Sequence, residues 1–166
     1  MGIEATMSKL AVEGKRNFVR EAWDRLAPLP GGRVVFGKLI GRAAPYTGSI
    51  DGRVEELRPG YARVTLRDRH AVRNHLDCVH AVALLNLAEL VGNLALSYGL
   101  PDDARFIPSG MSIAYHKKAR GTITGVCECP PVTDNARREH VLPVRLLNEA
   151  GEEVATVTVT TLVGPK

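Results

Sequence analysis

The longest apolar stretch of the chain covers residues 81–101, and Glu89 is its only charged residue. A surface helix normally mixes apolar and charged positions, whereas a helix that is apolar nearly all round is buried. The pattern predicts one long buried helix over residues 81–98, ended by Gly99 and Pro101. A carboxylate in a buried helix is costly unless it has polar partners or a chemical role, so Glu89 is the first functional candidate.

Two further helices are predicted before residue 50. Apolar side chains recur at near-helical spacing among charged ones over residues 4–27, and the PLPGG segment then breaks the chain. Residues 32–43 show a similar spacing up to Pro45. The apolar residues of this second segment would also suit a strand.

From Ile50 onward the apolar positions alternate, which is typical of strands. Two short runs, 54–58 and 61–67, meet at Pro59-Gly60 and predict a hairpin. Four more strand-like runs follow the long helix, at about 106–117, 121–129, 138–148 and 153–163. This order predicts an α+β fold in which an antiparallel sheet, ending in a four-stranded meander, wraps around the central helix.

The length of 166 residues favours a single globular unit, with residues 1–49 as a helical extension packed on a core of residues 50–166. A hydrophobic content of 45% is ordinary for a globular protein. The net charge of +4 is modest, aromatic residues make up only 5%, and no long Lys/Arg block is present. This composition argues against nucleic-acid binding.

The chain carries an odd number of cysteines, Cys78, Cys127 and Cys129, and shows no secretory pattern at its start. We therefore expect a reduced, cytoplasmic protein in which Cys127 and Cys129 lie on one face of a strand. The apolar run approaches the ~20 residues that a bilayer requires. A central carboxylate is expensive in lipid, so Glu89 argues against membrane insertion.

The most specific pattern lies in residues 74–89, where Asn74 and His80 precede a helix that carries Leu-Ala-Glu. This segment resembles the active-site region of hotdog-fold acyl-CoA thioesterases, in particular the phenylacetate-pathway branch and a related uncharacterised hotdog branch. The resemblance places Asn74 and His80 on the family's Asn and His, Ala81 on the first Gly of a Gly-Gly pair, and Glu89 on the catalytic carboxylate. It extends in element order over residues 50–163.

Three positions depart from the family pattern. Asp77 stands where the family has Gly, Ala81-Val82 replaces Gly-Gly, and the carboxylate is Glu89 rather than Asp. Glycine is used where a ligand must come close to the backbone, so the lost glycines bear on substrate approach.

The resemblance implies hydrolysis of an acyl-CoA thioester to a carboxylic acid and free CoA, with no cofactor besides the coenzyme A of the substrate. Glu89 would act as general base on water or as nucleophile, and an apolar setting should raise its pKa. The amides of Ala81 and Val82, at the start of the helix, would hold the oxyanion. Asn74 and His80 would orient water or the thioester. The family's dimer implies a homodimer or a homotetramer of two dimers, with Glu89 from one subunit facing Asn74 and His80 of the other.

A second segment, residues 111–121, resembles the strand and turn that follow the helix in that family. The resemblance implies contacts to the substrate, including the phosphates of coenzyme A, from Tyr115, Lys117, Lys118 and Arg120. Arg137 and Arg138 form a second basic pair.

Each candidate also has a structural alternative. Asn86, Glu89, Asn93 and Ser97 would form one polar stripe that is solvated or lies at an interface. His80 would cap the helix, Asn74 would serve as a turn residue, and the basic cluster would be solvated. His70, His75 and His80 recur every five residues, which suits no helical face and no zinc motif, so no metal site is predicted.

Two other functions remain open at the level of sequence. The lost glycines favour a non-catalytic acyl or acyl-CoA-binding protein on the same scaffold. A hotdog hydratase or dehydratase acting on enoyl thioesters would pair an acid with a His in a different motif, and the chain shows no such signature.

Overall fold

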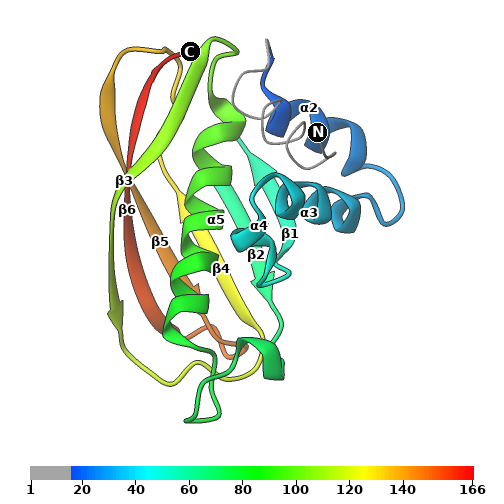
Figure 1. Ribbon diagram of the computed structural model, residues 1–166, viewed down its shortest axis with the longest axis vertical. Coiled ribbons are helices and arrows are strands. Elements are labelled where there is room, and N and C mark those ends of the chain that lie inside the picture. Colours follow the sequence, from blue (N-terminus) through cyan, green and yellow to red (C-terminus); the bar gives the residue numbers. More distant parts are fainter. Residues whose placement is uncertain (1–15) are drawn as a thin grey trace.

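The computed structural model describes residues 16–166. Its helices are α2 (Phe18–Leu26), α3 (Gly32–Ala43), α4 (Pro45–Gly48), the 3-10 turn η1 (His70–Val72) and α5 (Ala81–Gly99). Its strands are β1 (Arg53–Arg58), β2 (Tyr61–Leu66), β3 (Ala104–Tyr115), β4 (Ile123–Glu128), β5 (Arg138–Leu147) and β6 (Glu153–Pro165) (Figure 1). The predicted hairpin, the long helix and the helix over 32–43 are confirmed. Residues 4–15 of the first predicted helix lie outside the described residues.

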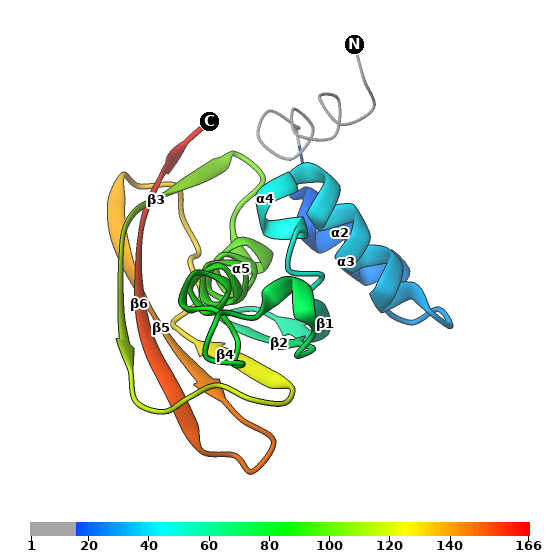
Figure 2. The same cartoon turned by 60° about the horizontal axis from the view of Figure 1, so that its bottom comes forward.

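The six strands form one antiparallel sheet in the order β1-β2-β4-β5-β6-β3. The sheet curls around α5, which is seen nearly end-on within its curve in Figure 2. The α+β fold with a sheet wrapped around a central helix is therefore confirmed. The predicted four-stranded meander is wrong in one strand, because β3 pairs with β6 and not with β4. Alternation marks a strand but does not say which strand it pairs with, so the sequence pattern could not place β3 at the edge.

The sheet-facing side of α5 accounts for the missing charges of this helix. Leu84, Leu87, Val91 and Ala95 are at most 3% exposed. Strand β4 passes close beneath them at Gly125, where an added Cβ would lie 2.7 Å from Val91 Cγ2. Among the described residues, α5 is the one helix that is long and apolar enough to cross a membrane. Within this fold, 61% of its most apolar 18-residue stretch is buried.

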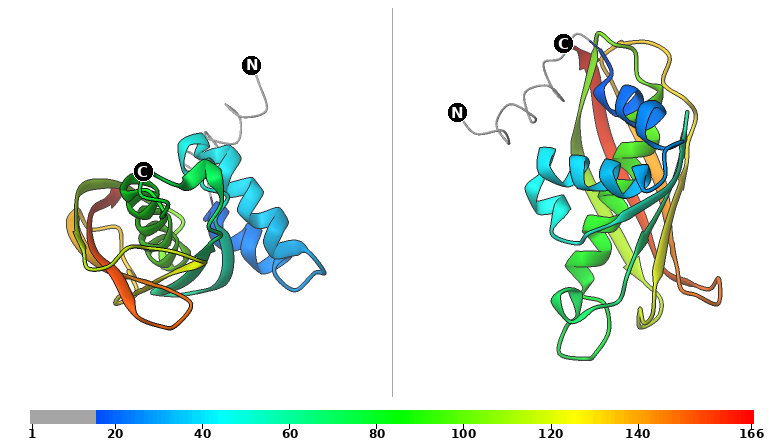
Figure 3. Two further views of the ribbon diagram at one scale, coloured as in Figure 1. Left: turned by 90° about the horizontal axis from the view of Figure 1, so that it is seen from below. Right: turned by 90° about the vertical axis from the view of Figure 1, so that its right-hand side faces the viewer.

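The N-terminal helices lie on the side of α5 that the sheet leaves open, next to β1 (Figure 2, Figure 3). Trp23 of α2 meets the fully buried Phe36 of α3 edge to face, with ring centroids 5.1 Å apart. Both rings belong to the same hydrophobic cluster as the strands and α5. The described part of the chain thus has one core, and the boundary at residue 50 stays a prediction.

Candidate active site

The first turn of α5 begins at an exposed histidine. His80 has extended backbone angles and caps the helix, since its Nδ1 accepts a hydrogen bond from the Val82 N–H at 3.0 Å. An imidazole that accepts at Nδ1 carries its proton on Nε2 when it is neutral, so Nε2–H is available to a ligand. The capping role and the site role of His80 are therefore compatible.

The backbone N–H groups of this turn differ in whether they already donate a hydrogen bond. The Val82 N–H is engaged by His80, and the Leu84 N–H donates to the His80 carbonyl. Among residues 16–166, nothing accepts a hydrogen bond from the N–H of Ala81 or Ala83. Helix N-termini carry a partial positive charge. Ala83, which sequence reasoning missed, therefore joins Ala81 as a donor open to an oxyanion, while Val82 is occupied in this conformation.

The preceding turn is organised by Asn74. Its Oδ1 accepts from the Leu76 N–H at 2.9 Å and from Cys78 Sγ at 3.4 Å, and its own N–H donates to the Cys78 carbonyl. Asn74 is thus a turn residue, as the structural alternative expected. Its Nδ2 has no partner among the described residues and can still donate to a ligand.

Asp77 adopts a left-handed conformation with φ +53°. This backbone geometry explains why the resembling family has glycine at the same place, since glycine reaches positive φ without a steric cost. Its exposed carboxylate contacts Arg73 Nη1 at 2.6 Å.

We expect Asp77→Gly to be more stable than Asp77→Ala by about 1 kcal/mol, because both lose the ion pair and only alanine keeps a Cβ in the left-handed region. Urea denaturation of the two variants measures the difference. Equal midpoints would show that the turn relaxes and that φ is not the constraint.

The predicted substrate-binding residues separate in the structure. The Tyr115 hydroxyl donates to the Ala81 carbonyl at 3.2 Å, so β3 brings this ring to the start of α5, and burial raises the pKa of the phenol. Lys117 is paired with Glu152 at 2.6 Å, whereas Lys118 has no hydrogen bond or ion pair with any described residue. Arg120 Nε donates to the Asp77 carbonyl at 3.4 Å.

Arg120 lines a charged hollow of about 430 Å³ below the turn, together with Arg67 and the Asp68–Arg73 pair. The hydrogen bond from Arg73 lowers the pKa of Asp68, and the Gly121 N–H also donates to this carboxylate. Arg67, which sequence reasoning did not single out, has no ion-pair partner among the described residues. Its place beside the turn is set by the end of β2, which local sequence does not reveal.

A second hollow, of about 370 Å³, lies between α4 and the start of α5. His80 and Val82 line it together with the apolar side chains of Ile50 and Val72. Asn86 lies at its inner side and donates from Nδ2 to the Tyr46 carbonyl at 3.1 Å. Two of the predicted catalytic residues, His80 and Val82, therefore lie beside apolar side chains in this hollow.

The stripe of polar residues on α5 is not simply solvated. Asn86 and Ser97 are each 4% exposed, and Oδ1 of Asn93 is buried without a partner among the described residues. The solvated alternative is therefore wrong for Asn86 and Ser97, because α2 and α4 cover them.

Glu89 is half-buried, and burial raises the pKa of its carboxyl group. No hydrogen-bond or ion-pair partner for it exists among residues 16–166. Glu89 follows Ala81 by eight residues on one helix, which separates them by about 12 Å along the axis. A carbonyl held by the Ala81 amide therefore cannot also touch Glu89 of the same subunit.

Within the described part of the chain, no group of three or more His, Cys, Asp or Glu side chains is placed to hold a metal ion. The three cysteines are buried and unpaired, and Cys127 lies in β4.

Comparisons with known proteins place the chain in a family and identify its fold. No curated protein matches the chain. A structural-genomics protein is 33% identical, with 90% of this chain and 99% of that chain covered and a TM-score of 0.78. A Pseudomonas aeruginosa protein described as a probable thioesterase is 22% identical (83% and 97% covered, TM-score 0.71). A Haemophilus influenzae thioesterase is 15% identical (72% and 82% covered, TM-score 0.65).

These two proteins, described as a probable thioesterase and a thioesterase, share the architecture of this chain, which confirms the predicted hotdog fold. The model of one family, described as a domain of unknown function (DUF4442), matches residues 32–163, from the start of α3 to the end of the sheet. The chain belongs to the DUF4442 family, and its hotdog fold is that of thioesterases.

Proposed function

We propose that the chain is a thioester hydrolase that converts an acyl-CoA to a carboxylic acid and free CoA. The observation that carries the proposal is Glu89, a half-buried carboxylate without a partner among the described residues, on a helix whose Ala81 and Ala83 amides are open. The fold shared with proteins described as thioesterases supports the same reading.

The separation of Glu89 and Ala81 along α5 requires a second copy of the chain. The midpoint between them is Leu85, and Val82 and Leu85 are part of the incompletely covered face of α5. A two-fold axis near Leu85 would set two α5 helices antiparallel and bring Glu89 of one copy to the Ala81 amide of the other.

The sheet offers a matching edge for this dimer. Strand β3 pairs with β6 on one side only, and it exposes Ile107, Met111 and Tyr115. A long apolar edge strand is a template for pairing with another chain. We infer a homodimer with a continuous sheet across β3, as the unit of activity within a dimer or a tetramer of two dimers.

The reaction follows from these positions. The thioester oxygen accepts from the N–H groups of Ala81 and Ala83, while Asn74 Nδ2 and His80 Nε2 supply further donors. Glu89 of the other copy removes a proton from water as the water oxygen bonds to the carbonyl carbon. Collapse of the tetrahedral intermediate breaks the C–S bond, and the CoA thiolate takes up the proton. The same placement would let Glu89 attack directly and form an anhydride that water then opens.

The phosphates of coenzyme A suit the charged hollow below the Asn74 turn. Lys118, Arg67 and Arg120 supply cations there or nearby, and Lys117 is already paired with Glu152. The unpaired cysteines suit a reducing compartment such as the cytoplasm.

One observation favours a second candidate, a non-catalytic acyl-CoA-binding protein. Val82 stands where the resembling family has glycine, its side chain is 47% exposed in the apolar hollow, and its amide is engaged by His80. This arrangement leaves a ligand pocket with fewer oxyanion donors than a Gly-Gly turn would give.

Thiol release from short, medium, long and aromatic acyl-CoAs separates the two functions. We expect catalytic turnover with at least one acyl class. Stoichiometric binding without thiol release would establish the binding protein instead, and a change in absorbance with crotonyl-CoA would indicate a hydratase. Neither binding nor release with any acyl class would contradict the proposal.

A further inference from the structure

The outward face of the sheet carries a notch where β3, β6 and the start of β5 lie side by side. Arg105 of β3 is paired directly with Gly164 of β6. On the other side of Gly164 lies Arg137, whose Cγ is 3.9 Å from the place where a Cβ of residue 164 would be. Two arginines therefore stand on either side of a glycine, and the missing side chain leaves a gap between them.

The notch opens onto an apolar floor. The next cross-strand pair on the same face of the sheet is Ile107 with Leu162, and Ile107 is 62% exposed. The two arginines, Gly164 and the Ile107–Leu162 pair line a single hollow of about 510 Å³. It is therefore large enough for a small molecule and not only for an ion.

No carboxylate of the described residues forms an ion pair with either arginine of the notch. The guanidinium groups of Arg105 and Arg137 form no hydrogen bond or ion pair with any residue in the range 16–166. The neighbouring carboxylates have other partners: Glu139 accepts from Ser109, Asp134 pairs with Arg138, and Asp103 accepts from Asn135.

The spacing suits a single anionic group. Neighbouring strands lie about 4.8 Å apart, so the two arginines start about 10 Å apart and their long side chains can converge above Gly164. Guanidinium groups bind phosphate in a two-pronged manner, and a phosphate monoester carries about two negative charges at neutral pH.

We propose that this notch binds a phosphate monoester or diphosphate whose apolar or ring-shaped body lies on Ile107 and Leu162. The site is separate from the proposed thioesterase site, because its residues lie on the outward face of the sheet, whereas α5, which carries Ala81 and Glu89, packs against the opposite face. A free nucleotide and the nucleotide portion of coenzyme A share this chemistry.

Calorimetric titration of the full chain with adenosine 3′,5′-bisphosphate tests the proposal directly, without any hydrolysis. We expect Arg105→Gln and Arg137→Gln each to weaken binding by about 10-fold or more, because each removes a charge-assisted contact. Gly164→Val keeps both charges and fills the notch, and it should abolish binding. The fold tolerates this change, since Gly164 does not have a positive φ and only Arg137 lies near its Cβ position.

Arg145→Gln is the matched control, because it removes an arginine from the same outward side of β5, where Glu153 already pairs with it at 3.5 Å. Binding that is unchanged in all three notch variants, or reduced equally by Arg145→Gln, would overturn the proposal. Equal binding of adenosine, which has no phosphate, would also overturn it.

Further titrations identify the source of the phosphate. Tighter binding of coenzyme A than of adenosine 3′,5′-bisphosphate would support the coenzyme, and the reverse order would support a free nucleotide. Either order supports the proposal only if binding depends on both arginines. Because the outcome does not involve Glu89 or thiol release, the notch and the thioesterase proposal can fail independently.

Discussion

Glu89→Gln is expected to lower thiol release from acyl-CoA by about 10²- to 10⁴-fold, the usual effect of removing a general base. Glutamine has the same shape but cannot take a proton from water or form an anhydride. Because Glu89 has no partner among the described residues, the change breaks no hydrogen bond of the described fold. Substrate binding and the cooperative unfolding transition should therefore persist.

The pH dependence gives an independent signature of the same residue. Burial raises the pKa of Glu89, so we expect the rate to rise with pH and to reach its plateau at a higher pH than it would with an ordinary glutamate as the base. A raised pKa in the folded state also contributes stability that is present below the unfolded pKa and lost as pH rises through the folded one. Glu89→Gln should remove this pH dependence of stability along with the activity.

Steady-state thiol release with the acyl-CoA that turns over best measures the effect, and equilibrium binding of the same substrate separates catalysis from recognition. Glu128→Gln is the matched control, since Glu128 is an exposed carboxylate at the end of β4. A Glu89→Gln protein that retained the wild-type rate would exclude the proposed mechanism.

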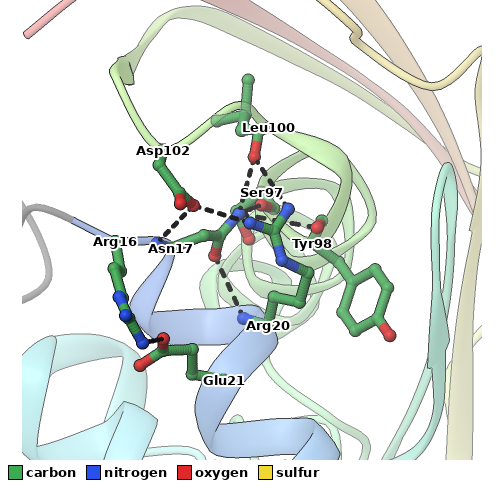
Figure 4. A network of polar contacts seen from close by, with 8 residues as sticks. All are labelled: Arg16, Asn17, Arg20, Glu21, Ser97, Tyr98, Leu100 and Asp102. Carbon is green, nitrogen blue, oxygen red and sulfur yellow. Dashed lines mark hydrogen bonds and ion pairs between the residues drawn. The ribbon is translucent and has the colours of Figure 1, made fainter.

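Asn17→Ala is expected to lower the free energy of unfolding by about 2–4 kcal/mol, the sum of a lost helix cap and two lost hydrogen bonds to backbone carbonyls. Asn17 is 9% exposed and serves two helices at once (Figure 4). Its Oδ1 accepts from the Arg20 N–H at the start of α2, and its Nδ2 donates to the carbonyls of Ser97 at 2.6 Å and Leu100 at 2.9 Å.

A serine at this position separates the two contributions. Asn17→Ser keeps an oxygen that can cap α2 but is too short to reach the carbonyls at the end of α5, so we expect a loss between wild type and alanine. Arg20 reinforces the same junction through Asp102 at 2.6 Å and through the Leu100 carbonyl. Urea denaturation measures all three proteins, and an alanine variant within about 0.5 kcal/mol of wild type would show that the junction is dispensable.

The sequence predicted much of the architecture because the relevant signals are local. The apolar run over 81–98, the alternation after Ile50 and the Pro59-Gly60 turn each reflect a repeat within a few residues. The resemblance carried by Asn74, His80 and Glu89 indicated the hotdog fold, which the structure confirms. Strand β3 was misplaced in the meander, because pairing partners depend on contacts between distant segments.

The candidate active site, like the fold, was only partly predictable from the sequence. Sequence alone identified Glu89 as an unusual carboxylate, because one charge in an apolar helix stands out without any structure. Only the tertiary structure showed that His80 occupies the Val82 amide and that Ala83 is open. These facts depend on rotamers and on backbone angles at a helix end, which a residue pattern does not specify.

The sequence by itself predicted the main elements and the curled sheet around a central helix from local periodicity, and a short motif singled out Glu89 as the candidate for the chemistry. The tertiary structure decided which strand forms the open edge, and its helix geometry separates Glu89 from the Ala81 amide by about 12 Å. It also set Arg105 and Arg137 on either side of Gly164. The physical reason is that such arrangements join residues far apart in the chain, and only the packing of the whole sheet fixes their register.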